Sequence, residues 1–404
     1  MYQEVIQVLL YASLLVILLA VGLIVYIFDV KSNYFPVPMV LLIIGIGLSF
    51  IPVFSRLGLN HDIIFDLLLP GILFVSAYSF PIRSLKKNIW PIATLGTLGL
   101  MATVFLMAVL IYLVAAPAAG LSFVAAFLIA SVLTPTDPVS VTAILENVFG
   151  DSDVPKVVEG ESMINDGTSV VLFGIASSMF LYNESFSIFS FLAEFLLVSL
   201  GGVAVGVAGG WLVTKAVHIM HNHVYQVMLS VILAYGGFYI AEGLGVSGVL
   251  ATVSAGIMLS RTFQKTEKEE ELHSYLDGFW KVVEPAVLSL LFLLIGIQSA
   301  DYLAFGHWLL AIGIFIISLI VRFIVLGGFL KLSPHIKERF QWSSVFMMTW
   351  SGLKGTVSVA LLLSIETQSS SSADLVVSLT FAAILLSLVI QSLGVYPLAK
   401  KFSS

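Results

Sequence analysis

Long apolar runs separated by short polar segments fill this sequence from one end to the other. Many of the runs approach the roughly 20 residues that a helix needs to cross the hydrocarbon core of a bilayer. They lack the strict two-residue alternation that is typical of membrane-spanning strands. The pattern therefore predicts an all-α polytopic membrane protein, because a spanning helix pairs all of its own backbone groups.

Thirteen spans are predicted on this scale. They cover residues 7–28, 37–53, 63–80, 90–115, 121–147, 157–182, 187–214, 225–243, 245–260, 276–298, 304–330, 343–364 and 374–398. The loops between them are too short to hold a soluble domain, so residues 1–404 are expected to form a single transmembrane domain.

Composition agrees with lipid as the surroundings of this chain. Hydrophobic residues make up 59% of the sequence and charged residues 10%, with a mean hydropathy of +1.06. About a quarter of an average soluble chain is charged. The sequence has no cysteine, which excludes disulfides and thiolate metal sites.

The basic residues predict the orientation of the chain in the membrane. If the C-terminus is cytoplasmic, 14 of the 18 Lys and Arg residues fall in cytoplasmic loops. Only Arg56 falls on the outside, and Lys281, Arg322 and Lys354 lie within spans. Because Lys and Arg favour the cytoplasmic side, the N-terminus is expected outside and the C-terminus inside.

The fifth span contains a stretch that cannot continue as a helix. It runs Thr134-Pro135-Thr136-Asp137-Pro138, and each proline removes a backbone donor. Unwound backbone at membrane depth is tolerated where it lines a cavity, and its freed carbonyls and hydroxyls are then available as cation ligands. The alternative is a kinked helix in which Asp137 only caps a turn.

The sixth span places three polar side chains on one helical face. Ser162, Asn165 and Asp166 are spaced at i, i+3 and i+4, and Glu161 points to the side. If the span begins near residue 157, Asp166 lies ~14 Å along it, near the middle of a ~30 Å core. A carboxyl group there must be protonated, paired or bound to an ion. Asp166 is therefore the predicted ion-binding carboxylate.

A second interruption is predicted where Gly352 and Gly355 flank Lys354 in the middle of the twelfth span. Two broken spans, one in each half of the chain, indicate an inverted-repeat transporter with a site near the midplane, where the lysine offsets the helix dipoles. A lysine that reaches the membrane surface is the alternative. Arg322 cannot lose its proton and needs a buried anion, for which Glu161 is the expected partner.

These residues resemble those of the monovalent cation:proton antiporter family, in the branch of the bacterial and archaeal NhaP proteins and the animal sodium/proton exchangers. The resemblance covers nearly all spans. Its most specific parts are Thr136-Asp137-Pro138, Glu161-Ser162 with Asn165-Asp166, Arg322, Gly352-Leu353-Lys354-Gly355, Phe279-Trp280 and the run Phe292-Leu293-Leu294-Ile295-Gly296.

The resemblance implies a homodimer of two-part protomers. Residues 1–89 and 187–303 would form the scaffold and dimer interface, and residues 90–182 and 304–398 the core bundle that moves against it. The two interrupted helices would cross at the midplane. No cofactor is expected beyond the transported ions.

The resemblance also implies roles for single residues. The position matching Asp166 carries the exchanged cation, and the positions matching Asp137, Thr136, Ser162 and Asn165 surround that ion. Glu161 and Arg322 match a buried structural ion pair. An Asn before the Asp, as at Asn165, goes with electroneutral exchange in this family.

The chain departs from the family pattern at three positions. Val75 stands where relatives usually carry an acid, Lys354 where many carry Arg, and Leu288 where many carry Asn. Glu284 in the tenth span has two interpretations: a carboxylate that assists ion binding, or a residue that caps a helix turn. Thr134 is a further accessory candidate.

Together these features predict a secondary antiporter that exchanges Na⁺ for H⁺ and serves pH homeostasis, with K⁺ and Li⁺ as alternative cations. One carboxylate holds a cation or a proton but not both. The expected partners are these ions and the lipid bilayer, with no nucleic acid. A cation channel or a transport-inactive sensor of the same fold is the alternative. An intramembrane aspartyl protease is disfavoured because its Tyr-Asp and Gly-x-Gly-Asp motifs are absent, so no enzyme is expected.

Overall fold

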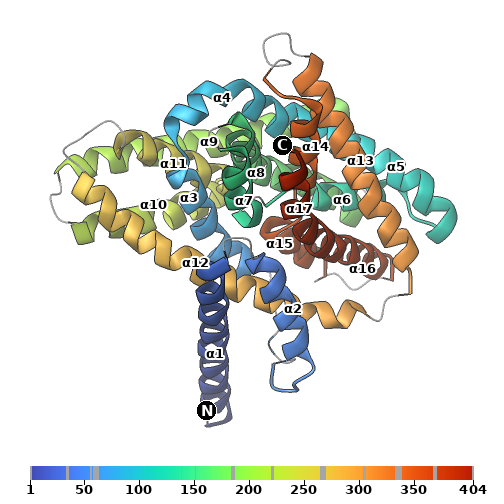
Figure 1. The fold of residues 1–404 in the computed structure, drawn as a ribbon, viewed down its shortest axis with the longest axis horizontal. Helices are drawn as coiled ribbons and strands as arrows, with labels where there is room; N and C mark the ends of the chain where they lie inside the picture. Colours follow the sequence, from blue (N-terminus) through green and yellow to red (C-terminus); the bar gives the residue numbers. More distant parts are fainter. Residues whose placement is uncertain are drawn as a thin grey trace.

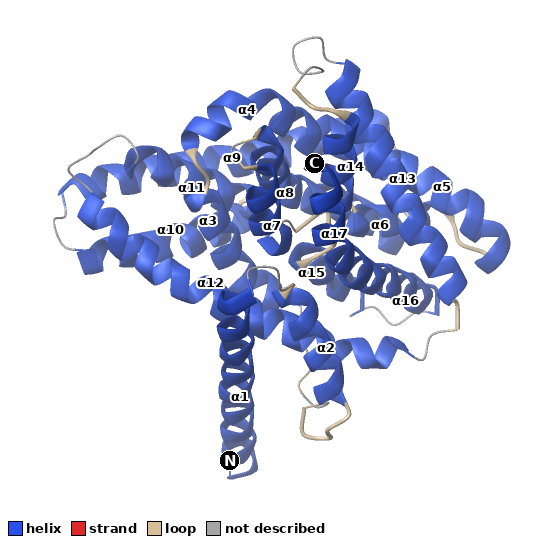
Figure 2. Ribbon diagram, viewed as in Figure 1, coloured by secondary structure: helices blue, strands red, loops and turns tan. Residues whose placement is uncertain are grey.

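A computed structural model shows a helical protein. It describes residues 2–32, 36–54, 57, 63–137, 139–150, 152–182, 187–219, 223–263, 270–303, 306–332, 339–366 and 371–402. Figure 2 shows helices joined by short loops, and no strand occurs in these ranges. The predicted all-α class is therefore confirmed.

The first half of the chain forms eight α-helices and two π-helical turns within the described ranges. They are α1 (Tyr2–Ser32), α2 (Val37–Ser49), η1 (Ile63–Leu68), α3 (Leu69–Ser79), α4 (Ile82–Thr94), η2 (Leu95–Gly99), α5 (Leu100–Ala119), α6 (Phe123–Leu133), α7 (Val139–Phe149) and α8 (Asp153–Tyr182).

The second half begins with four long helices. Its elements are α9 (Ile188–Ile219), α10 (His223–Gly243), α11 (Gly248–Phe263), α12 (Glu270–Leu303), α13 (Trp308–Leu332), α14 (Trp342–Trp350), α15 (Thr356–Glu366), α16 (Ser371–Leu386), the π-helical turn η4 (Ser387–Gln391) and α17 (Ser392–Phe402).

The predicted spans coincide with these helices. The spans 121–147 and 343–364 are each split into two helices, α6 with α7 and α14 with α15, which confirms both interruptions. In the described part of the chain, eight helical stretches are long and apolar enough to cross a membrane, and four shorter apolar helices accompany them. The polytopic class is confirmed, while the count of thirteen spans stays a prediction.

Several helices extend beyond the predicted spans. The helix that contains span 90–115 begins at Ile82, and α12 begins at Glu270 rather than at 276. Hydropathy marks only the part of a helix that suits hydrocarbon, whereas these ends carry charges such as Arg83 and Lys87. The start of span 304–330 falls on residues 304–305, which lie outside the described ranges.

The helices gather into two groups (Figure 1). In one, α11 packs against α3, α9 and α10, and α12 packs against α1 and α2. In the other, α5 packs against α6 and α13, and α16 packs against α13 and α15. Helix α8 contacts both groups, through α6 on one side and α11 on the other, so residues on α8 lie where the two groups meet.

Close helix contacts depend on residues without a side chain. A Cβ added to Gly296 of α12 would lie 2.2 Å from the carbonyl oxygen of Leu42 on α2. A Cβ added to Gly206 of α9 would lie 2.0 Å from the carbonyl oxygen of Ala251 on α11. In a bilayer, where apolar burial hardly drives association, such backbone approach supplies much of the packing between helices.

Candidate functional site

The first break lies between α6 and α7, at residues 134–137. Pro135 has no N–H to continue the helix, and Pro138 of the same motif lies outside the described residues. The freed polar groups are taken up by other segments. Ser358 of α15 donates to the carbonyl oxygen of Pro135 at 3.5 Å, and the Asp137 N–H donates to the carbonyl oxygen of Leu353 at 2.8 Å. The break is therefore held by long-range contacts.

Helix α8 presents its polar face to this break. Asn165 donates through Nδ2 to Thr136 Oγ1 at 2.9 Å, and the Thr136 N–H donates to Asn165 Oδ1 at 3.4 Å. The Ser162 hydroxyl donates to the carbonyl oxygen of Thr136. All three side chains are buried. The spacing at i and i+3 thus brings Ser162 and Asn165 onto the same unwound residue, as their shared helical face requires.

The second break lies between α14 and α15, at residues 351–355. Its Leu353 carbonyl accepts the hydrogen bond from Asp137, so the two interrupted helices touch at their breaks. The glycine after Lys354 makes this approach feasible. A Cβ on Gly355 would lie 2.2 Å from Asp137 Cβ and 2.5 Å from Asp137 Oδ2. The expected crossing of the two broken helices is confirmed by these contacts.

Gly355→Ala is expected to reduce cation exchange by at least about tenfold, because the new methyl group overlaps the buried Asp137 side chain and overpacking costs ~1–3 kcal/mol. Initial exchange rates in proteoliposomes, normalised to folded protein, measure the effect. Gly174→Ala on α8 is the matched control, since a Cβ there meets no atom within 4 Å. Equal rates for the two variants would contradict the close crossing.

Asp166 lies one residue beyond Asn165 on α8 and is half-buried. In the described part of the chain, no hydrogen-bond donor reaches its carboxylate. The charges that act on it are those of Asp137 and Glu161, both of the same sign. A half-buried carboxylate with acidic neighbours and no protein donor is stabilised by binding a proton or a cation. This is the chemistry that the sequence assigned to Asp166.

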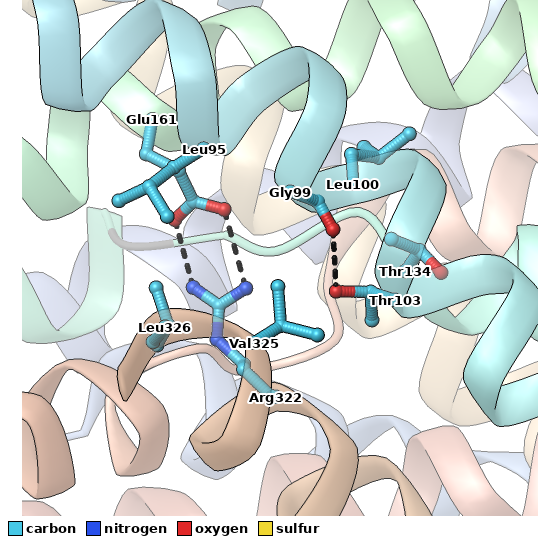
Figure 3. A pocket seen from close by; sticks show the side chains of 9 residues that line it. All are labelled: Leu95, Gly99, Leu100, Thr103, Thr134, Glu161, Arg322, Val325 and Leu326. Atoms are coloured by element: carbon cyan, nitrogen blue, oxygen red, sulfur yellow. Dashed lines mark hydrogen bonds and ion pairs between the residues drawn. The ribbon is translucent and has the colours of Figure 1, made fainter. Parts of the chain in front are cut away.

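Glu161 and Arg322 face one another across the interior (Figure 3). Arg322 of α13 donates through Nη1 and Nη2 to the two carboxylate oxygens of Glu161, at 3.2 and 2.8 Å. Both side chains are buried. Glu161 also accepts from Asn165 Nδ2 at 2.9 Å. The pair thereby connects α8 and α13. Glu161 also orients the side-chain amide of Asn165, which bonds to Thr136.

A cavity of about 10 Å³ lies beside this pair (Figure 3) and is lined in part by Thr103, Thr134, Glu161 and Arg322. It holds about one water molecule at most. Thr134 donates to the carbonyl oxygen of Ala130 at 2.6 Å. The structure therefore places Thr134 on the ion-pair side of the first break rather than with the Asp166 group.

Lys354 is buried within the second break. Its charge interacts with those of Arg322 and Glu161, and no ion pair joins its amine to a carboxylate within the described residues. Glu284 lies on α12, half-buried, and interacts electrostatically with Asp137. Val75 packs against Phe74 and Trp280 in an apolar cluster.

Three residues that the sequence patterns did not single out hold the breaks. Ser358 contacts the first break, and Ser387 and Gln391 contact the second. All three side chains are buried. Their signal in the sequence is a polar residue inside an apolar run, with Ser387 and Gln391 four residues apart on one helical face.

Several known proteins are similar to this chain in sequence. The family described as "Sodium/hydrogen exchanger, transmembrane" matches residues 14–401. The Na⁺/H⁺ antiporter ApNhaP of Aphanothece halophytica is 30% identical over 392 residues, which are 95% of this chain and 74% of that protein. The Na⁺/H⁺ antiporter NhaH of Halobacillus dabanensis is 32% identical over 348 residues, or 84% and 82% of the two chains.

A solved structure shows the same fold. The sodium proton antiporter MjNhaP1 of Methanocaldococcus jannaschii at pH 8 superposes with a TM-score of 0.76 at 20% identity, over 98% of this chain and 99% of that one. The family match spans almost the whole sequence and includes both breaks, the polar face of α8 and Arg322. The chain belongs to the sodium/hydrogen exchanger family.

Proposed function

We propose that this protein is a secondary active antiporter that exchanges Na⁺ for H⁺ across the cell membrane by alternating access. The observation that carries the proposal is the half-buried Asp166 carboxylate, which has acidic neighbours and no protein donor among the described residues. It lies on α8, the helix that contacts both helix groups. Family membership and the antiport activity of the relatives support the same reaction.

The proposed cation ligands are oxygens of Asp166, Asp137, Asn165, Ser162 and Thr136. Carboxylate, amide and hydroxyl oxygens suit a hard cation. In the proton-loaded state Asp166 is protonated, and the cation takes the place of that proton. Asn165 is a neutral amide that already bonds to Thr136 and Glu161. Of residues 165 and 166, Asp166 alone can therefore exchange a proton. This favours electroneutral exchange.

The two helix groups suggest how access alternates. In the proposal, residues 90–182 and 304–398 form the core that moves, and residues 1–89 and 187–303 form the scaffold and a homodimer interface. The boundary at 89–90 falls inside α4, which continues through η2 into α5 and packs on α8. We therefore move the boundary in this proposal to residues 81–82, so that all of α4 belongs to the core. The N-terminus lies outside and the C-terminus in the cytoplasm.

Competition between Na⁺ and H⁺ is the first expected result. In proteoliposomes the apparent KM for Na⁺ should rise as pH falls, approaching about tenfold per pH unit once the proton dominates, because one pH unit is 1.36 kcal/mol of proton binding. The maximal rate should change much less. Dequenching of a pH-sensitive dye on addition of Na⁺, K⁺ or Li⁺ measures both and ranks the cations.

Two outcomes would contradict the antiport proposal. A cation current without proton counterflow would indicate a channel, and a folded protein that moves no ion under any gradient would indicate a sensor. An antiporter is driven by either gradient, so an imposed Na⁺ gradient must move protons and an imposed pH gradient must move Na⁺. Empty liposomes provide the background.

Glu284→Gln is expected to raise the apparent KM for Na⁺ by roughly three- to tenfold and to leave the maximal rate within about twofold. The reason is that removing a nearby negative charge weakens cation binding by about the free energy of one pKa unit. Glu284 on α12 interacts electrostatically with Asp137 at the first break. It would thus act as the accessory carboxylate of a chain that has Val75 where relatives usually carry an acid.

The matched control is Glu146→Gln, which removes a carboxylate from an exposed ion pair with Lys156. Its KM should equal that of the wild type. Glu284→Asp keeps the charge and should recover most of the affinity. If Glu284→Gln and Glu146→Gln are indistinguishable, Glu284 only caps its helix turn and has no role in ion binding.

A further inference from the structure

The last membrane segment of the chain contains a π-helical turn. Helices α16 and α17 are joined by η4, and the first and last residues of that turn are Ser387 and Gln391, both fully buried. Their side chains bond to each other, because the Ser387 hydroxyl donates to Gln391 Oε1. π-Helical turns of this kind are frequent at functional sites. Here the turn faces the second break.

The second break leaves several backbone groups without helical partners. Helix α14 ends at Trp350, and the last carbonyls of any helix lack intrahelical donors. The N–H groups of Ser351 and Gly352 bond back to the carbonyls of Met347 and Thr349. The Leu353 carbonyl accepts from Asp137. The carbonyls of Trp350 and Gly352 and the N–H of Lys354 take their partners from outside the segment.

Gln391 and Ser387 satisfy these remaining groups. Gln391 donates through Nε2 to the carbonyl oxygens of Trp350 at 2.7 Å and Gly352 at 3.5 Å. The Lys354 N–H donates to Ser387 Oγ at 3.0 Å, and the Ser387 hydroxyl donates to Gln391 Oε1. The Trp350 indole N–H donates to the carbonyl oxygen of Gln391 at 3.0 Å. One side chain thus caps α14, and the other holds the residue that carries the buried amine.

We propose that Ser387 and Gln391 are positioning residues that hold the second break, and with it Lys354, against the first break, and that the rate of ion exchange depends on them. The inference rests on the proposed antiport function. Lys354 has no side-chain ion pair in the described residues, so the position of its amine is set by its backbone. That backbone is anchored by Ser387 on one side and, through Leu353, by Asp137 on the other.

This arrangement gives η4 a mechanical role. Ser387 and Gln391 are fully buried where they bond to the break, so each anchor excludes alternative conformations of the segment. If one anchor is lost, the segment samples states in which Lys354 and the Leu353 carbonyl leave the crossing. The expected consequence is local opening of residues 351–355 in an otherwise folded protein.

The test compares Ser387→Ala with Ser392→Ala. Ser392 is buried one residue beyond η4, and its hydroxyl has no partner within the described part of the chain. Both variants remove the same atom. Hydrogen exchange, followed by mass spectrometry on peptides covering residues 347–359, should become at least about tenfold faster in Ser387→Ala and stay unchanged in Ser392→Ala. Peptides elsewhere should match the wild type.

Exchange rates in proteoliposomes give the functional result. Ser387→Ala should lower the maximal rate about tenfold, because losing this anchor shifts the equilibrium of residues 351–355 toward the opened form by about a factor of ten. Ser387→Thr keeps the hydroxyl and should stay within about threefold of the wild type. Trp350→Phe, which removes the indole donor to Gln391, should show the same local opening and serves if Ser387→Ala does not fold.

Three outcomes would overturn the inference: equal hydrogen exchange of residues 347–359 in Ser387→Ala and Ser392→Ala, faster exchange throughout the protein, or local opening with an unaltered transport rate. Failure of the antiport proposal is recognised separately, because the wild type would then show no Na⁺-driven proton movement. The hydrogen-exchange comparison does not require transport and would still report whether the two residues hold the break.

Discussion

Asp166→Asn is expected to lower Na⁺/H⁺ exchange by at least about a hundredfold, the scale of losing a positioned proton-transfer group. Asparagine is close in size to aspartate but neither carries a negative charge nor takes up a proton at working pH. The Asp166 carboxylate accepts no hydrogen bond from the protein within the described residues, so the substitution removes no hydrogen bond of that side chain. Initial rates in proteoliposomes, beside thermal unfolding in detergent, separate lost transport from lost folding.

The unfolding temperature of Asp166→Asn should equal or exceed that of the wild type, because an acidic neighbour of Asp137 and Glu161 has been neutralised. Na⁺ should raise the unfolding temperature of the wild type and leave that of the variant unchanged. Asp374→Asn, at an exposed position of α16, is the control and should transport normally. A folded Asp166→Asn protein with more than a tenth of the wild-type rate would rule out Asp166 as the ion carrier.

The parts of the fold that sequence analysis predicted correctly depend on local rules. Pro135 removes a backbone donor inside an apolar run, and with Pro138 three residues later it marks the first break. Gly352 and Gly355 mark the second break because a charged residue between two glycines is unusual in an apolar span. Ser162 and Asn165 meet the same threonine because helical spacing places them on one face. Each of these inferences requires only the neighbouring residues.

What could not be predicted depends on distances between segments far apart in the chain. Gln391 is one of several polar residues in apolar runs, and its spacing does not reveal that it caps a helix that ends 41 residues earlier. Thr134 and Thr136 are equivalent in the sequence, yet Thr136 bonds to Asn165 on α8 whereas the Thr134 hydroxyl bonds back to Ala130 of its own helix. Helix ends outside the hydrocarbon are set by packing and ion pairs rather than by hydropathy.

Arg322→Met and Glu161→Met are each expected to lower the unfolding temperature by on the order of 10 °C. Removing one member of a buried ion pair leaves an unpaired charge and costs ~3–5 kcal/mol. Here the pair is bidentate and buried, and Arg322 Nε has no acceptor of its own in the described structure. Thermal unfolding of purified protein, followed by tryptophan fluorescence, measures the loss.

The exposed pair of Lys156 with Glu146 is the matched control. Glu146→Gln should change the unfolding temperature by less than about 3 °C, because exposed ion pairs contribute ~0–1 kcal/mol. The double variant Glu161→Met with Arg322→Met should be more stable than either single variant, since no charge is left buried alone. A double variant as unstable as the sum of the singles would show that the two side chains act independently.

Stability and transport should separate in this double variant. Glu161 also accepts from Asn165, whose amide holds Thr136 in the first break. Methionine pairs do not replace that acceptor, so Asn165 loses one of its orienting bonds although the charge imbalance is gone. A stable double variant with exchange reduced about tenfold or more would mean that Glu161 orients the ion site as well as neutralising Arg322. If the double variant recovers both the stability and the exchange rate of the wild type, the only role of the pair is to neutralise buried charge.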